Sequence, residues 1–266
     1  MIVEKSRIRR IGREIFWAVM PKSLEFEPYT TRLVGKETNY VVRSGPFRGM
    51  KYVKGSPPNI LPPKLLGIYE RELHRVIESI VSYPFKTIVD IGAGEGYYCA
   101  GLALRMPKAK IVAYERIELA RKIMKELADL NQVADRLTIK GVCTIEELNS
   151  VLDPSESTLV ICDVEGAEAY LLDPLRVLAL GSAFILVELH DCVIGGLSDV
   201  IRARFESTHD IEQIFAEARS RSEFPFSTLL TRCFDCYPSY AVSDCRPGGM
   251  SWYWMRPKAR AGEQGS

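Results

Sequence analysis

Thr87-Ile-Val-Asp-Ile-Gly-Ala-Gly-Glu-Gly-Tyr-Tyr98 decides the fold of this chain. The stretch begins as an apolar strand, because Ile88 and Val89 are β-branched residues that suit a parallel strand buried on both faces. Three alternating glycines then allow a sharp turn, and because they lack a Cβ a ligand can lie against bare backbone. A helix expected over residues 97–104 points its N-terminus at that ligand. The stretch therefore predicts a small-molecule site behind the first strand of a parallel sheet.

The residues around the glycines indicate which small molecule fits. A dinucleotide fingerprint, G-x-G-x-x-G counted from Gly92, requires glycine at the position that Tyr97 occupies. Asp90 and Glu95 also place two carboxylates beside the turn, where they repel a pyrophosphate. A cationic ligand without phosphate, such as S-adenosylmethionine with its sulfonium and ammonium groups, avoids this repulsion. A dinucleotide-dependent oxidoreductase is therefore the disfavoured alternative.

A second strand, expected over residues 110–115, ends in Glu115. A carboxylate at the end of this strand can accept hydrogen bonds from both hydroxyls of a ribose. The residues that we expect to bind the cofactor S-adenosyl-L-methionine are Asp90, Gly92, Ala93, Gly94, Gly96, Glu115, Arg116, Val142, Cys143 and Asp163.

The motif from Asp90 to Gly96, taken with Glu115, resembles the first two motifs of class I S-adenosylmethionine-dependent methyltransferases. Asp163-Val-Glu-Gly-Ala-Glu168 and Ile185-Leu-Val-Glu-Leu-His190 resemble the FkbM-type branch of that superfamily. The resemblance covers roughly residues 65–215. It implies O-methylation of a hydroxyl on a sugar, polyketide or other small metabolite, with an N-methyltransferase or a macromolecule methyltransferase as the alternative. A non-catalytic module that only holds the cofactor is the alternative from another class.

The resemblance also bears on adenine recognition. Many relatives carry an aspartate just after the third strand that accepts a hydrogen bond from the adenine amino group. Val142 and Cys143 stand at that place in this chain. Adenine must therefore be recognised by backbone groups or by another side chain.

Strands and helices alternate through the rest of the chain, which predicts a parallel sheet with helices on both faces. We expect an α/β, Rossmann-like sheet of seven mostly parallel strands, preceded by an N-terminal helix and a β-hairpin. The expected strands after the first are 110–115, 136–141, 158–163, 183–190, 209–215 and 251–255, and the expected helices are 65–82, 97–104, 118–130, 145–151, 171–180 and 197–205.

Polar residues at the carboxyl ends of these strands should meet on one rim, because ligands of open parallel sheets bind there. His190 is the expected general base, since it titrates near neutral pH and has Glu188 and Asp191 as neighbours that could orient it. The expected catalytic residues are His190, Asp163, Glu165 and Glu188. Asp163, Glu165 and Glu168 also resemble a divalent-ion site, but a metal would need further acid from the fifth strand, so we expect no metal.

Composition narrows the class of protein. The chain has 266 residues, of which 47% are hydrophobic and 26% charged, and a formal net charge of +1. The balanced charge gives no reason to expect nucleic acid as a partner. No apolar run approaches the roughly 20 residues of a membrane helix, and no signal peptide is evident, so we expect a cytoplasmic enzyme acting on a small hydroxylated molecule.

Seven cysteines are present, and Cys233, Cys236 and Cys245 form their only cluster. A zinc site there lacks a fourth ligand nearby in sequence unless His209 supplies it from elsewhere in the fold, so unpaired thiols are the favoured interpretation.

The ends of the chain follow other patterns. Residues 4–20 are expected to form an amphipathic, basic helix that either packs on its own domain or weakly contacts an anionic membrane surface. A hairpin is expected across residues 39–54, and four prolines within residues 56–63 predict a stiff connector without regular structure. These features suggest an extension over residues 1–63, a cofactor-binding domain over 64–258 whose insertion at about 220–249 covers the acceptor pocket, and a disordered tail over 259–266.

Overall fold

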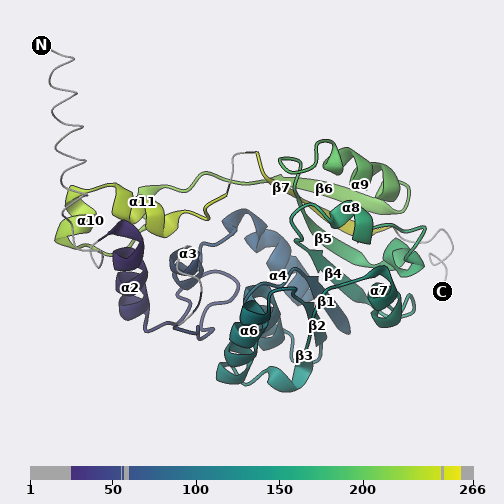
Figure 1. Cartoon of the computed structure of the whole chain (residues 1–266), viewed down its shortest axis with the longest axis horizontal. Helices are drawn as coiled ribbons and strands as arrows, with labels where there is room; N and C mark the ends of the chain where they lie inside the picture. Colours follow the sequence, from purple (N-terminus) through teal and green to yellow (C-terminus); the bar gives the residue numbers. More distant parts are fainter. Residues whose placement is uncertain (1–24, 55, 57–59, 247–248, 259–266) are drawn as a thin grey trace, which may run out of the picture.

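A computed structural model describes residues 25–54, 56, 60–246 and 249–258. The basic helix expected at residues 4–20 and the tail at 259–266 lie outside this part. Seven strands form one sheet, in the order β3-β2-β1-β4-β5-β7-β6. β7 is antiparallel to both of its neighbours, β5 and β6, and the other strands share one direction, which confirms the mostly parallel sheet (Figure 1). The strands are β1 (Thr87–Ile91), β2 (Lys110–Tyr114), β3 (Leu137–Lys140), β4 (Thr158–Cys162), β5 (Phe184–Leu189), β6 (His209–Phe215) and β7 (Ser251–Pro257).

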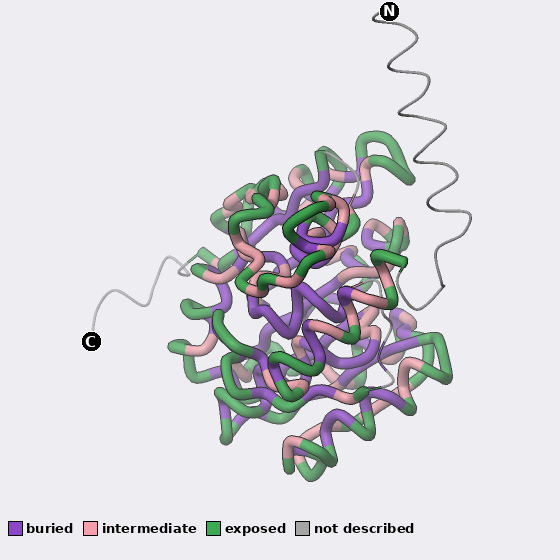
Figure 2. The backbone as a smooth tube through the Cα atoms, turned by 90° about the vertical axis from the view of Figure 1, so that its left-hand side faces the viewer, coloured by how far each residue is buried: buried purple, intermediate pink, exposed green. Residues whose placement is uncertain are grey.

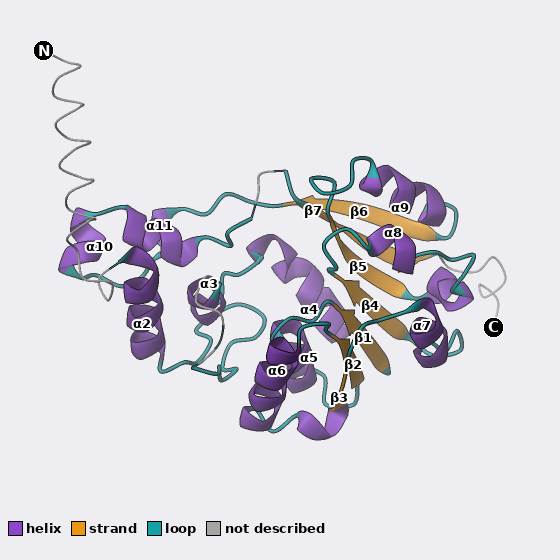
Figure 3. Ribbon diagram, viewed as in Figure 1, coloured by secondary structure: helices purple, strands orange, loops and turns teal. Residues whose placement is uncertain are grey.

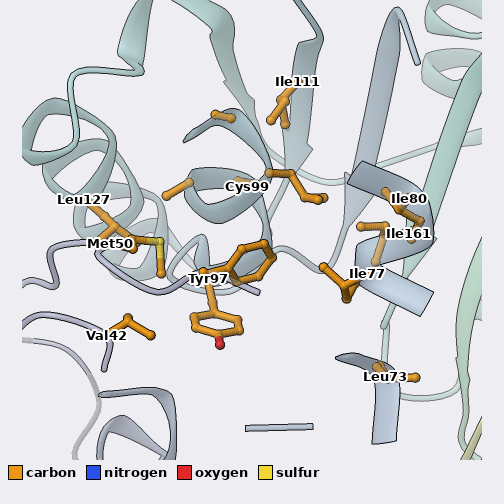
Figure 4. Close-up of a cluster of buried hydrophobic side chains, with 14 of the residues drawn as sticks. Val42, Met50, Leu73, Ile77, Ile80, Tyr97, Cys99, Ile111, Leu127 and Ile161 are labelled. Carbon is orange, nitrogen blue, oxygen red and sulfur yellow. The ribbon is translucent and has the colours of Figure 1, made fainter. Parts of the chain in front are cut away.

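Helices cover both faces of the sheet (Figure 3). One face carries α4 (His74–Ser82), α5 (Tyr97–Arg105) and α6 (Glu118–Leu130), and the other carries α7 (Ile145–Val151), α8 (Glu168–Leu171) and α9 (Leu197–Phe205). Each face has its own hydrophobic cluster, because the central strands are apolar on both sides. Figure 4 shows the first cluster, whose members include Ile77 of α4, Leu127 of α6 and Ile111 of β2. In Figure 2 the buried parts of the backbone lie mainly inside the molecule and the exposed parts mainly around them.

A separate group of helices, here called the helical cap, lies beside the sheet (Figure 1). It consists of α2 (Phe26–Thr38), α3 (Leu61–Leu66), α10 (Leu229–Cys233) and α11 (Cys236–Val242). Edge-to-face ring pairs join α2 to α11, with centroids 5.3 Å apart for both Phe26–Tyr240 and Tyr29–Tyr237. The N-terminal segment and the insertion at residues 220–249 therefore pack on each other although they are far apart in sequence.

Several expectations for the N-terminal region are wrong. The sequence did not predict α2, in which Thr30, Val34 and Thr38 are buried. The hairpin is reduced to a turn closed by one antiparallel bridge between Val41 and Lys51, without regular strands.

The proline connector contains a helix instead of an irregular segment. α3 starts at Leu61 and accommodates Pro62 and Pro63 in its first turn, where the missing N–H groups would have no helical partner anyway. The left-handed Gly67 then ends α3, so the single helix expected over 65–82 is broken into α3, a 3₁₀ turn (Arg71–Leu73) and α4.

The helix expected over 171–180 is also shorter than predicted. Only α8 and a 3₁₀ segment (Leu178–Ser182) form there. Two further 3₁₀ turns are Ala134–Arg136 and Arg221–Glu223. Among the described residues, no helix has the length and apolar character needed to cross a membrane.

A buried ion pair joins the helical cap to the glycine turn after β1. Lys64 of α3 binds Glu95, whose carboxylate also accepts a 2.6 Å hydrogen bond from the Tyr52 hydroxyl. The side chains of Lys64 and Glu95 are 4% and 8% exposed. Burial acts to raise the pKa of Glu95, but Lys64 and Tyr52 outweigh it and hold that pKa below its ordinary value.

Lys64→Met should destabilise the protein by about 3–5 kcal/mol, because it leaves a buried carboxylate without its counter-charge. Lys86→Met is the matched control, since Lys86 pairs with Glu156 at 3.8 Å on the surface and should contribute about 0–1 kcal/mol. Urea unfolding of the two variants and the parent measures the difference. Equal midpoints for both variants would mean that the buried pair does not stabilise the cap.

Candidate active site

A cavity of about 790 Å³ lies beyond the carboxyl ends of the parallel strands. Its walls come from the glycine turn, from the ends of β2, β4 and β5, and from the helical cap. Every residue expected to bind the cofactor or to act in catalysis lines this cavity, with the exception of Gly96. Those that line it are Asp90, Gly92, Ala93, Gly94, Glu115, Arg116, Val142, Cys143, Asp163, Glu165, Glu188 and His190.

The glycines of the turn have three different roles. Gly92 has φ +82°, and a Cβ there would overlap the carbonyl oxygen of Asp163, so this position admits only glycine. Gly94 has φ +54°, and a Cβ there would meet no atom within 4 Å, which leaves its backbone open to a ligand. Gly96 instead lies against Met124 of α6, where it allows α5 to start close to α6. It does not line the cavity, and its expected role in cofactor binding stays a prediction.

Glu115 is held in place at the end of β2 by backbone donors. Its Oε2 accepts a 2.9 Å hydrogen bond from the Gly94 N–H, and its Oε1 accepts a 2.7 Å hydrogen bond from the Ile117 N–H. These bonds leave lone pairs on both oxygens, so the carboxylate can still accept two hydroxyl groups.

The charges beside the glycine turn differ from those expected. Glu95 is neutralised by Lys64. Asp90 is buried, and this burial, opposed by a 3.0 Å hydrogen bond from the Cys99 thiol, raises its pKa to about 7. The negative charge that faces a ligand therefore comes mainly from other carboxylates of the cavity, including Glu115 and Asp163.

His190 lies at the end of β5 and is buried. Its Nδ1 is 2.6 Å from Oε1 of Glu168, a fully buried carboxylate that also accepts from the Val164 and Gly166 N–H groups. Because Glu168 only accepts, Nδ1 carries a proton and Nε2 faces the cavity. Nε2 lies 3.6 Å from Oδ1 of Asp163 and 3.4 Å from Oε2 of Glu165.

The electrostatics of His190 and Asp163 are linked. Burial acts to lower the pKa of His190, but the hydrogen bond and charge of Glu168, with Asp163 and Glu165, raise it above its ordinary value. Burial in the cavity, reinforced by the charge of Glu70, raises the pKa of Asp163 to about 6.

The expected partners of His190 are wrong. Asp191 accepts hydrogen bonds from the backbone and hydroxyl of Ser198 and so holds the first turn of α9. Glu188 forms an ion pair with Arg246. Glu168, which the sequence grouped with a metal site, orients the imidazole instead. His209 is not part of the site, because its Nε2 binds the Ala183 carbonyl at 2.8 Å inside the sheet.

Arg246 is the main cavity residue that the sequence does not reveal. It pairs with both Glu70 and Glu188, and its guanidinium lies 4.9 Å from the centre of the Trp252 ring. A topological signal was present: β7 runs antiparallel to β5, so the residues just before β7 arrive at the rim where β5 ends. Tyr69 and Lys64, which also line the cavity, come from the helical segments before β1.

One group of side chains in the described part of the chain has the spacing of a metal site. Asp163, Glu165 and His190 each offer a ligand atom, and these atoms lie within 4.8 Å of one another. The cysteine cluster at residues 233–245 forms no such group within the described residues.

No protein-family model and no curated protein matches the chain. Among solved structures, the METTL16 methyltransferase domain is 13% identical, with a TM-score of 0.50 over 87% of this chain and 78% of that one. The precorrin-6Y C5,15-methyltransferase of Geobacter metallireducens is 15% identical, with a TM-score of 0.39 over 52% and 73%. The fibrillarin/Nop5p complex is 9% identical, with a TM-score of 0.42 over 55% and 75%. The chain thus shares its Rossmann-like α/β fold with the METTL16 methyltransferase domain.

Asp90→Asn should change how stability depends on pH. A carboxyl whose pKa is raised from 3.8 to about 7 on folding weakens the fold as pH rises between these values. The asparagine variant lacks this ionisation, so its stability relative to the parent should be about 2 kcal/mol higher at pH 8 than at pH 5. Urea unfolding at both pH values measures this, with the exposed Asp135→Asn as control. A stability difference that is the same at pH 5 and pH 8 would contradict the raised pKa.

Proposed function

We propose that the protein is an S-adenosylmethionine-dependent methyltransferase that methylates a hydroxyl of a small metabolite or sugar. The observation that carries this proposal is Glu115, which two backbone N–H groups fix directly beside the open backbone of Gly94. This arrangement suits a ribose whose two hydroxyls bind one carboxylate. It does not suit a diphosphate, which Glu115 would repel.

The adenine ring is assigned to the apolar patch next to Glu115. Ile117 and Val142 are 54% and 67% exposed although both are large and apolar, and both line the cavity. A flat ring between them would remove this apolar surface from water. Cys143 and Arg116 complete this end of the cavity, and backbone groups there can take the place of the aspartate that the chain lacks after β3.

The methionine part of the donor would then extend past the glycine turn. Asp163 lies at the end of β4, where an ammonium or sulfonium group would be attracted to its charge. Asp90 at the end of β1 contributes less, because its raised pKa leaves it only partly ionised near neutral pH. Glu70 and Glu188 are already paired with Arg246, and Glu95 with Lys64. The unpaired acids thus remain for the cationic donor.

The acceptor is assigned to the corner formed by Asp163, Glu165 and His190. In the reaction, an acceptor oxygen attacks the methyl carbon of the donor, and the carbon–sulfur bond breaks with its electron pair on sulfur. The products are a methyl ether and the neutral thioether S-adenosylhomocysteine. The hydroxyl proton is taken up at the corner, and rate is gained by holding the oxygen in line with the methyl group.

The hydroxyl acceptor is supported by the FkbM-type motifs from Asp163 to Glu168 and from Ile185 to His190. N-methylation, or methylation of a macromolecule, would use the same donor site. A module that only binds the donor is disfavoured, because such a module has no need of a buried carboxylate that orients a histidine at the open end of the cavity.

Glu115→Gln should weaken the binding of S-adenosylmethionine roughly 10- to 100-fold, because hydroxyl bonds to a charged acceptor are worth about 1.5–3 kcal/mol. Calorimetry measures this, with the exposed Glu118→Gln as control. The parent should not bind NAD. Tight NAD binding, or an unchanged donor affinity in Glu115→Gln, would overturn the cofactor assignment.

His190→Ala should lower turnover about 10²- to 10⁴-fold while the affinity for S-adenosylmethionine is retained, since the imidazole lies at the acceptor end. The assay uses a panel of hydroxylated metabolites and detects S-adenosylhomocysteine. His209→Asn changes a buried histidine outside the cavity and serves as control. An unchanged rate in His190→Ala would remove His190 from the mechanism.

A further inference from the structure

The corner of Asp163, Glu165 and His190 has an unusual arrangement of lone pairs. Glu168 accepts the hydrogen bond from Nδ1–H of His190, so in the neutral form of the ring the Nε2 lone pair points into the cavity. Both neighbours of Nε2 are carboxylate oxygens, which also only accept when they are ionised. Three electron-pair donors therefore converge with no hydrogen between them.

The distances distinguish two explanations of this arrangement: a proton on Nε2, or an ion bound by all three groups. An imidazolium would bring its Nε2–H to about 2.7–2.9 Å from one carboxylate, as charge-assisted hydrogen bonds do. The separations are 3.6 Å to Asp163 and 3.4 Å to Glu165, and Nε2 makes no hydrogen bond in the described structure. Ligands bound at about 2.0–2.2 Å to one ion lie roughly 3.0–3.5 Å from each other, which is close to these separations.

Neighbouring groups favour a cation at this place. Within the described residues, no lysine or arginine forms an ion pair with Asp163 or Glu165, although Arg246 pairs with two other acids of the cavity. His190 is 3% exposed, so its ring is held by the surrounding protein and is not free to turn away. The carboxylate–histidine pair made by Glu168 and His190 is also the arrangement that orients metal-binding histidines.

We propose that this corner binds one divalent cation, with Nε2 of His190 and the carboxylates of Asp163 and Glu165 as ligands and with Glu168 as the residue that positions the imidazole. A nitrogen ligand with two carboxylates suits Mn²⁺ or Zn²⁺ better than Mg²⁺ or Ca²⁺, which prefer oxygen ligands only. Three protein ligands leave coordination positions open toward the cavity.

The consequence of this cation for catalysis rests on the proposed function. Two expectations from the sequence change, namely the absence of a metal and the role of His190 as the base. The fifth strand completes the site with His190, where an acid had been thought necessary, so the expectation of no metal is revised. An acceptor hydroxyl bound to the cation would ionise more easily and release its proton to solvent. His190 then acts as a ligand and does not take the proton itself.

The test is a titration of the full chain, freed of metal with a chelator, with Mn²⁺ alone and with neither donor nor acceptor present. Electron paramagnetic resonance counts free and bound ions. The parent should bind one Mn²⁺ per chain. Glu165→Gln should weaken that binding roughly tenfold or more, and Glu168→Gln roughly 10- to 100-fold.

Glu37→Gln, at an exposed position of α2, is the matched control and should bind like the parent. The Glu165 side chain is 79% exposed, so its variant should fold, and circular dichroism checks this. Failure of the parent to bind Mn²⁺, or equal binding by Glu165→Gln, overturns the cation site. Because donor binding is measured separately by calorimetry, a chain that binds Mn²⁺ but not S-adenosylmethionine keeps the site and refutes the proposed function, and the reverse result refutes the site alone.

Discussion

The site depends on the close approach of the backbone at Gly92 to the carbonyl of Asp163, which leaves no room for a Cβ. The N–H groups of Gly92 and Ala93 donate to the Tyr114 carbonyl at 2.8 and 3.1 Å, and the Asp163 N–H donates to Ile91 at 2.9 Å. Through these contacts the ends of β1, β2 and β4 meet at one turn. The carboxylates that follow β2 and β4 are thereby brought to opposite sides of the same bare backbone.

Ion pairs between the cap side and the sheet side determine which charges a ligand meets. Lys64 forms an ion pair with Glu95, and Arg246 forms ion pairs with Glu70 and Glu188. Farther from the sheet, Arg219 bridges Glu72 and Asp244 at 2.6 Å each. These pairs hold the cap in place. They also leave fewer acids free to attract a cationic ligand, since a paired carboxylate attracts such a ligand less. The acids that remain beside the glycine turn and at the end of β4 carry the selection of a positively charged donor.

Much of the sheet was predictable because local patterns determine it. The periodicity of apolar residues gave β6, α6 and α9 with the bounds that the structure has, and the glycine turn gave the start of the cavity. The cap was not predictable in this way, because α2 packs on α11, which lies far away along the chain. The partner of His190 was equally hidden: sequence neighbours suggested Asp191, whereas folding brings Glu168 to Nδ1.

The central claim is that the cavity beside Gly94 selects a cationic sulfur donor over a phosphorylated dinucleotide. The most direct measurement is a crystal structure grown with S-adenosylhomocysteine and NAD present at equal concentration. The account predicts density for the adenosyl group with its ribose hydroxyls on Glu115 and no density for phosphate. Diphosphate density against the glycine turn would contradict it.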